Sequence, residues 1–490
     1  MQNIWSISGR SIAVSALALA LAACQSMRGP EPVAQANIPE AYATNASGSS
    51  IAAQGYKDFF VDQRLLQVLD LAVANNRDLR TATLNIQRAQ QQYQITENNQ
   101  LPTIGASGGV VRQVSQTTGS NNAYSTYNVG LGVTAYELDF WGRVRSLKDN
   151  ALDNFLATAS ARNATQISLI GQVSQAWLSY SFANAKLKLA EQTLKAQLES
   201  YNLNKKRFDV GIDSEVPVRQ AQISVETARN DVANYKTQIA QAKNLLNLLV
   251  GEQVPANLLP NQRVTRITNA SALSVGLPSD LLNNRPDVRA AEYQLSAAGA
   301  NIGAAKAQLF PTISLTGSAG YASTSLSDLF KSGAFVWSLG PSIKLPIFDW
   351  GTRKANIKIS ETDQQIALSN YEKSIQSAFR EVNDALATRQ NIGDRLSAQR
   401  RLVDATNVTY KLSNARFRAG IDSFLTVLDS QRSSYAAEQG LLLLEQANLN
   451  NQIELYKTLG GGVKTNTTDE VVQQPSSAEL KQNTQNQNAK

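Results

Sequence analysis

The chain has 490 residues, a formal net charge of +7 at pH 7, one cysteine and no histidine. It therefore cannot build a histidine-based catalytic triad, a Cys/His zinc site or an internal disulfide bond. No carboxylate pair has a distinctive spacing, and no basic cluster is interleaved with aromatic residues, so we expect no enzyme activity, no metal site and no nucleic-acid partner.

Residues 1–23 are predicted to be a secretory signal peptide. Arg10 precedes an apolar run that ends in small residues at 21–23, the arrangement that directs export and cleavage. Cys24 follows directly, is the only cysteine, and completes a stretch that resembles a bacterial lipobox. We therefore predict that Cys24 carries lipid and becomes the mature N-terminus; a chance cysteine behind an ordinary export signal is the alternative. Residues 24–60 are predicted to continue as an extended surface segment.

Residues 61–251 are predicted to contain a helix, two strands, a long helix and a further helix. Apolar residues three and four positions apart predict these helices: 65–100, about 143–206 and 218–250. Pro102 ends the first helix and Gly211 ends the second, while Asp213 and Ser214 are cap candidates for the third. The long helix would extend about 96 Å and each flanking helix about 50 Å. These lengths favour an antiparallel sheath in which two short helices stacked end to end match one long helix.

Strands are predicted in both halves of the chain, each time between the first two helices of that half. Apolar residues alternate with small or polar residues over 127–135, 313–321 and 335–345, as a membrane-spanning strand with one lipid-facing side requires. A soluble sheet with one wet face is the alternative. No stretch of about 18 apolar residues follows the signal, so we expect no membrane-spanning helix.

The number of strands predicts an oligomer if the sheet lies in a membrane. Two strands per repeat give four per chain, too few to close a barrel, and unpaired strand edges are costly in lipid. Two chains would form an eight-stranded barrel filled by side chains, whereas three would form a twelve-stranded barrel that can leave a lumen.

The second half of the chain repeats the first. Arg-Phe-x-x-Gly-Ile-Asp-Ser occurs at 207–214 and again at 416–423, an offset of 209 residues. Prolines cluster between the copies and mark residues 252–278 as a linker. Residues 279–460 are therefore predicted to repeat the element order of 61–251. The polar, Gln/Asn-rich residues 461–490 are predicted to be largely disordered.

Together these features resemble the outer-membrane factor family of TolC-like channels, most closely its OprM-type lipoprotein branch. The resemblance covers about residues 60–462 and rests on the duplication, the cysteine after the signal, Arg-Phe-x-x-Gly at both long-helix ends and Trp-Gly after both strand pairs. It implies an α+β membrane protein that forms a trimer. Four strands from each chain would build a 12-stranded outer-membrane β-barrel, which continues into a long periplasmic α-helical barrel with an equatorial belt. Gln25 after the cysteine implies outer-membrane sorting.

The same resemblance implies a passive exit duct of a tripartite efflux system, most often proton-driven multidrug efflux. Its partners would be two further copies of the chain, a periplasmic adaptor protein, an inner-membrane pump of RND type and outer-membrane lipid. No cofactor is implied beyond the covalent lipid on Cys24. Export of proteins or metal ions is an alternative, and a trimeric coiled-coil surface lipoprotein without a conducting lumen is another.

The resemblance also assigns roles to the two repeated turns. It implies an adaptor-docking periplasmic tip formed by Arg207, Phe208, Gly211, Asp213, Arg416, Phe417, Gly420 and Asp422. It further implies a periplasmic gate at Leu425, Asp429 and Arg432. Phe417 replaces a family tyrosine, so the hydroxyl contact of that tyrosine is missing here.

Each of these assignments has a simpler structural alternative. The glycines and acids of the turns could serve only as helix stops and caps. Asp429 and Arg432 could form an ordinary i,i+3 surface pair. Trp141 and Trp350 are predicted to be membrane-interface anchors, and packing at the bend between strand and helix is their alternative. The residues 209 positions before the gate are Val216, Gln220 and Ile223, which lack the acid and the base, so the gate is assigned to the second hairpin.

Replacing Cys24 with alanine is expected to abolish lipid attachment, because an acyl group needs the cysteine sulfur. Metabolic labelling with tritiated palmitate checks this, and label on the Cys24→Ala chain would overturn the lipidation prediction.

Overall fold

The computed structural model describes residues 27–35, 54–117, 120–268 and 284–461, and Cys24 lies outside them. The chain divides into two compact units. One contains Met1–Gln35, Asn85–Thr158 and Ala290–Glu372, and the other contains Ala36–Leu84, Ala159–Arg289 and Lys373–Lys490. Within the described ranges, no helix is both long enough and apolar enough to cross a membrane.

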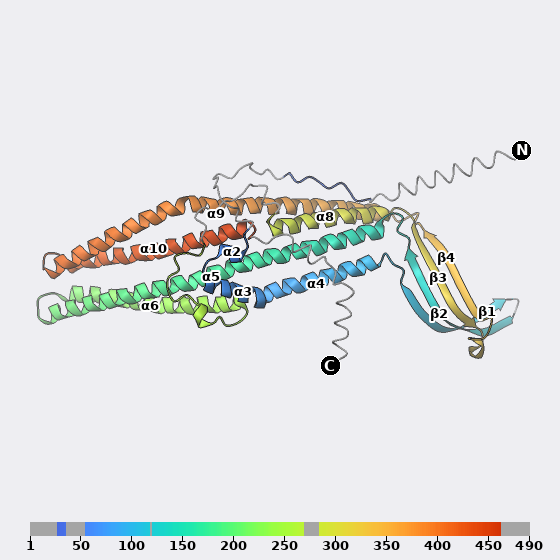
Figure 1. Ribbon diagram of the computed structural model, residues 1–490, viewed down its shortest axis with the longest axis horizontal. Helices are drawn as coiled ribbons and strands as arrows, with labels where there is room; N and C mark the ends of the chain where they lie inside the picture. The colour runs from blue at the N-terminus through green and yellow to red at the C-terminus, as the bar shows by residue number, and fades with distance from the viewer. Residues whose placement is uncertain (1–26, 36–53, 118–119, 269–283, 462–490) are drawn as a thin grey trace. The chain divides into compact units, whose positions relative to one another are not determined.

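In chain order, the first repeat runs from helices through a strand pair to further helices (Figure 1). Its elements are α2 (Tyr56–Phe59), α3 (Gln63–Asn75), α4 (Arg77–Asn98), β1 (Ile104–Thr117), β2 (Ser120–Glu137), α5 (Arg143–Asp209) and α6 (Glu215–Val250). The second repeat has the same core order: α8 (Pro286–Ala307), β3 (Thr312–Ser323), β4 (Phe335–Lys344), α9 (Thr352–Arg418) and α10 (Phe424–Thr458). The short helices η2 (Ala256–Leu258) and η3 (Leu326–Asp328) lie in the linker and between β3 and β4.

The predicted long helices are confirmed, with α5 and α9 each containing 67 residues. The single helix predicted over 65–100 is wrong, because α3 and α4 are separated at Asn76, which has an extended backbone. The Asn76 amide nitrogen donates to the Leu249 carbonyl at 2.7 Å, and its side-chain oxygen accepts from the Leu79 N–H at 2.8 Å. Asn76 thus begins a new helix while bonding the end of α6.

The four strands form one antiparallel sheet in the order β1-β2-β3-β4. Its register aligns Leu131 with Ala319, and Ala319 with Trp337, so the predicted apolar sets share one face. Small and polar side chains occupy the opposite face, where the Ser318 and Ser338 hydroxyls are 2.8 Å apart. The predicted alternation is therefore confirmed, in β2 as far as Val133, where the register shifts. Strands β1 and β4 each leave one edge unpaired within this sheet.

In both repeats, the end of the last helix contacts the backbone just before the helix that leads to the strand pair, α4 or α8. A β-carbon added to Gly251 would lie 2.5 Å from the Asn75 carbonyl oxygen, and one added to Gly460 would lie 2.4 Å from that of Asn284. Both glycines have positive φ, 84° and 98°. These contacts require glycine on steric and conformational grounds, which explains why glycine occurs at both positions.

Arg285 takes the position in the second repeat that Asn76 has in the first. It is buried, donates to the Thr458 carbonyl at 3.1 Å, and pairs with Asp287 at 2.6 Å and Glu381 at 2.9 Å. Burial alone would raise the pKa of Asp287, but the hydrogen bond and charge of Arg285 outweigh it and lower that pKa. A charged network thus replaces the neutral amide at the same junction.

Aromatic packing builds the core around the linker in the second unit. Tyr456 contacts the rings of Phe59 and Phe60, with centroids 4.6 Å and 5.7 Å away. The Trp177 indole is fully buried and donates to the Leu258 carbonyl at 3.0 Å. The linker is thereby fixed against α5.

Replacing Gly251 with alanine is expected to lower the thermal midpoint by several degrees. The side chain would meet backbone that cannot rotate away, and the left-handed conformation alone costs about 1–3 kcal/mol. The control is Gly393→Ala, where a β-carbon meets nothing within 4 Å and helix propensity favours alanine. Thermal unfolding followed by circular dichroism compares the two, and equal midpoints would contradict the steric argument.

Candidate functional site

The two repeated turns end their long helices in the same way. Gly211 and Gly420 both have φ of 74°. The Ile212 N–H donates to the Arg207 carbonyl and the Ile421 N–H to that of Arg416, both at 2.9 Å. Each glycine N–H also donates at 2.9 Å, to the carbonyl of Phe208 or Phe417. The two bonds of each turn form a Schellman motif, which satisfies carbonyls at a helix end. Glycine is required here for its backbone conformation.

The arginine and aspartate of each turn pair with each other. Asp213 accepts from Arg207, and Asp422 accepts from both Nε and Nη2 of Arg416, at 2.7 Å and 3.0 Å. The hydrogen bonds from Arg416 lower the pKa of Asp422. Ser214 occupies the N-cap position of α6, as predicted, but its side chain makes no cap bond, and the other candidate, Asp213, binds Arg207 instead. Each aspartate therefore links the residues after its turn to the end of the preceding long helix.

The phenylalanines of the two turns lie in different environments. Phe208 is 42% exposed, whereas its counterpart Phe417 is 5% exposed. Phe417 contacts Phe424 with ring centroids 5.6 Å apart, and the Arg207 guanidinium lies 5.3 Å from the Phe417 ring centroid. Such a cation–π contact contributes about 0.5–1 kcal/mol at exposed sites. Arg207 therefore links the first hairpin to the second.

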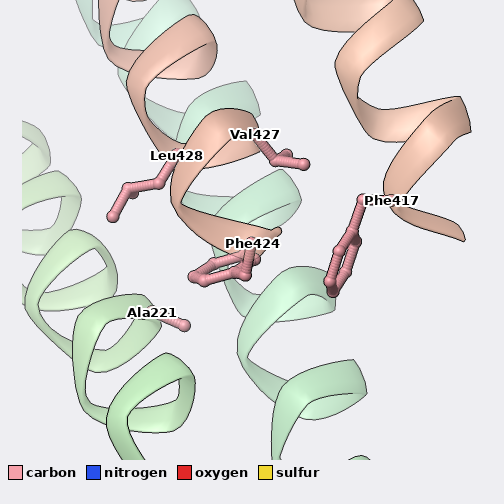
Figure 2. Packing of buried hydrophobic residues seen from close by; sticks show 5 residues of the cluster. All are labelled: Ala221, Phe417, Phe424, Val427 and Leu428. Carbon is pink, nitrogen blue, oxygen red and sulfur yellow. The ribbon is translucent and has the colours of Figure 1, made fainter. Parts of the chain in front are cut away.

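A small apolar core joins the two hairpins (Figure 2). Its buried members are Ala221, Phe417, Phe424, Val427 and Leu428. Figure 2 shows Ala221 on α6 facing the Phe424 and Leu428 side chains of α10. Tyr201 and Tyr410 pack against this core from the long helices. The second hairpin is thus held to the first by burial of apolar surface.

Sequence divergence between the repeats creates this core. The residues 209 positions before Phe424 and Leu428 are Glu215 and Arg219. These two are exposed and form an ion pair at 2.7 Å. Sequence reasoning missed Phe424 and Leu428, although comparing the two copies position by position beyond the shared motif would have found them.

The predicted gate residues lie on a neighbouring face of α10. Leu425, Asp429 and Arg432 are all exposed, whereas Phe424 and Leu428 are buried. Within the described ranges, no hydrogen bond or ion pair joins Asp429 to Arg432, so the ordinary surface pair is not formed. One chain therefore presents these three side chains on a common outward face.

The two predicted interface tryptophans also differ. The Trp141 indole donates to the Pro311 carbonyl at 2.8 Å and stacks on Phe310 with centroids 4.7 Å apart. Trp350 is 95% exposed and has a positive φ of 56°. Trp141 is therefore held by packing at the bend between strand and helix, whereas Trp350 projects outward beside Phe348.

Replacing Phe424 with glutamate, the residue of the first repeat, is expected to release the start of α10. Losing a buried phenylalanine costs about 3–5 kcal/mol, so tryptic cleavage after Arg416 and Arg418 should become roughly tenfold faster or more. The reverse change, Glu215→Phe, alters an exposed position and is the control. Equal cleavage rates in both variants would show that this core does not hold the tip.

The chain is similar to known proteins over most of its length. The model of the outer membrane efflux protein family matches residues 68–252 and 277–461. The antibiotic efflux pump outer membrane protein ArpC of Pseudomonas putida is 42% identical over 443 residues, covering 89% of this chain and 91% of that protein. The cation efflux system protein CusC of Escherichia coli is 38% identical over 434 residues, covering 87% and 93%.

A solved structure has the same fold. The open state of the MtrE outer membrane channel of Neisseria gonorrhoeae aligns with a TM-score of 0.83 at 38% identity, covering 90% of this chain and 99% of that one. Relatives at this identity over nearly the whole chain establish more than a shared architecture. The chain belongs to the outer membrane efflux protein family, whose members are efflux channels and not enzymes.

Proposed function

We propose that this chain forms the outer-membrane exit duct of a proton-driven multidrug efflux system and is closed at rest at its helical tips. The observation that carries the proposal is the four-stranded sheet, which has two open edges and an exposed apolar face. Trp337, Leu339 and Ile343 all lie exposed on that face. Such a surface suits lipid, but its open edges do not.

Three copies resolve this conflict. Three four-stranded sheets would pair β4 of one chain with β1 of the next and close a twelve-stranded barrel that leaves a lumen. The small and polar face would line the lumen and the apolar face would contact lipid. The exposed Trp350 would then lie at the membrane interface, where tryptophan is favoured.

The helices would continue the duct into the periplasm. At 1.5 Å per residue, α5 and α9 each extend about 100 Å, and the same helices from three chains would enclose a tunnel. An equatorial belt would come from residues 24–60 and 252–278. After removal of residues 1–23, the lipid on Cys24 would add a second attachment to the outer membrane.

The second hairpin would carry the gate. Leu425, Asp429 and Arg432 share an exposed face of α10, so three copies around one axis would bring their side chains together at the mouth. A ring of aspartates favours cations there. The paired turns at 207–213 and 416–422 would dock a periplasmic adaptor, which connects the duct to an inner-membrane pump of RND type and opens the gate.

The kind of cargo follows from the relatives. ArpC belongs to an antibiotic efflux pump and is 42% identical to this chain, which supports a duct for organic compounds. The likeness to CusC, a cation efflux protein at 38% identity, favours metal-ion export as the second candidate. Neither of these two relatives supports protein export. Family membership sets aside a non-conducting coiled-coil lipoprotein.

Conductance tests the duct and its gate together. Purified protein, shown by native mass spectrometry to contain three chains, is expected to conduct weakly in a planar lipid bilayer. Asp429→Ala or Arg432→Ala should raise resting conductance and the sensitivity of cells to vancomycin, because each removes a side chain from the closed mouth. The control is Gln220→Ala, the first-repeat counterpart of Asp429. Absence of current in every variant would exclude a channel, and unchanged conductance in both gate variants would refute the gate.

A further inference from the structure

Helix α10 is held differently along its length, and the change occurs at residues 434–440. Before this segment, residues 424–428 meet the first hairpin through the apolar core described above. In the described part of the chain, no side-chain hydrogen bond or ion pair joins residues 424–433 to another helix. Apolar contacts have no directional requirement, so this end of α10 can shift without breaking a polar bond.

Two hydrogen bonds then join α10 to α6, one helical turn apart. The Tyr435 hydroxyl donates to Oδ2 of Asp231, and Nε2 of Gln439 donates to the Tyr235 hydroxyl, both at 3.0 Å. Each pair is separated by 204 residues. The equal separations mean that both bonds join α10 to α6 in one register.

The same segment of α10 is bonded to α9 on its other side. The Ser434 hydroxyl donates to Oδ1 of Asn407 at 2.6 Å, and Nδ2 of Asn407 donates to Glu438 at 3.1 Å. Nε2 of Gln399 donates to the Ala437 carbonyl at 2.8 Å. Polar bonds to α6 and α9 therefore surround α10 at one level, and we name residues 434–440 the polar collar.

Gly440 completes the polar collar by allowing close approach. A β-carbon at this position would lie 2.7 Å from Nε2 of Gln399. Among the described residues of the first repeat, the counterparts of Tyr435 and Gln439 form no such bonds to another helix; they are Glu226 and Asn230. Both are exposed, and Glu226 pairs with Arg229 on its own helix. The polar collar therefore belongs to the hairpin that bears the exposed gate residues.

We propose that the polar collar is the pivot of the second hairpin. Beyond it, α10 stays fixed to α6 and α9, while residues 424–433 swing as a lever about 15 Å long. Directional hydrogen bonds resist sliding and rotation at the collar, whereas the apolar core can repack. The lever carries Leu425, Asp429 and Arg432, so this inference rests on the proposed gate when it assigns a consequence to the motion.

Amide hydrogen exchange on the full-length protein in detergent tests the pivot without requiring conduction. Exchange along α10 is expected to be fast over 424–433 and slow over 441–458, with the change at the polar collar. Tyr435→Phe and Asn407→Ala each remove bonds on one side of the collar. Each should accelerate exchange over 441–449 about two- to tenfold, the effect of losing roughly one net hydrogen bond.

Tyr410→Phe is the matched control, because it removes a half-buried hydroxyl near the tip and outside the collar. Equal protection on both sides of the collar, or unchanged exchange over 441–449 in both collar variants, would overturn the pivot. Conductance of Asp429→Ala separates the two proposals. If exchange changes at the polar collar but Asp429→Ala leaves conductance unaltered, the gate is refuted and the pivot stands. If Asp429→Ala raises conductance but exchange shows no boundary at the polar collar, the pivot is refuted and the gate stands.

Discussion

Each repeat depends on one steric constraint, the contact of a glycine at the end of its last helix with the backbone just before α4 or α8. Gly251 meets the Asn75 carbonyl, and Gly460 meets that of Asn284. Any side chain at either glycine would push these segments apart. Because α4 and α8 begin beside these contacts, the contacts set the directions in which both helices leave the junction. The duplicated architecture therefore depends on two residues that have no side chain, Gly251 and Gly460.

Divergence between the repeats has then changed what equivalent positions do. The exposed Glu215–Arg219 pair of one hairpin corresponds to the buried Phe424 and Leu428 of the other. Asn76 corresponds to the charged network of Arg285. The shared residues build turns and junctions, whereas the unshared residues give the second hairpin both its apolar core and its exposed acid and base.

Apolar and polar contacts hold different parts of α10. The tip of this helix is held by packing, which tolerates displacement, and the polar collar is held by hydrogen bonds, which do not. The cation–π contact of Arg207 with Phe417 adds a further link between the hairpins at the tip. The two hairpins are therefore joined at the tip mainly by contacts that need no directional hydrogen bond.

The sequence by itself determined the duplication, the long helices, the strand alternation and the glycine stops, because each is written in local periodicity or in an internal comparison. It did not reveal the break at Asn76, since the Leu249 carbonyl that Asn76 bonds lies far along the chain. Nor did it predict that Asp213 would bind Arg207, or that Trp141 would be packed while Trp350 is exposed. Tertiary structure decided these outcomes, because identical local motifs were placed against different neighbours, and burial and bonding depend on the neighbour.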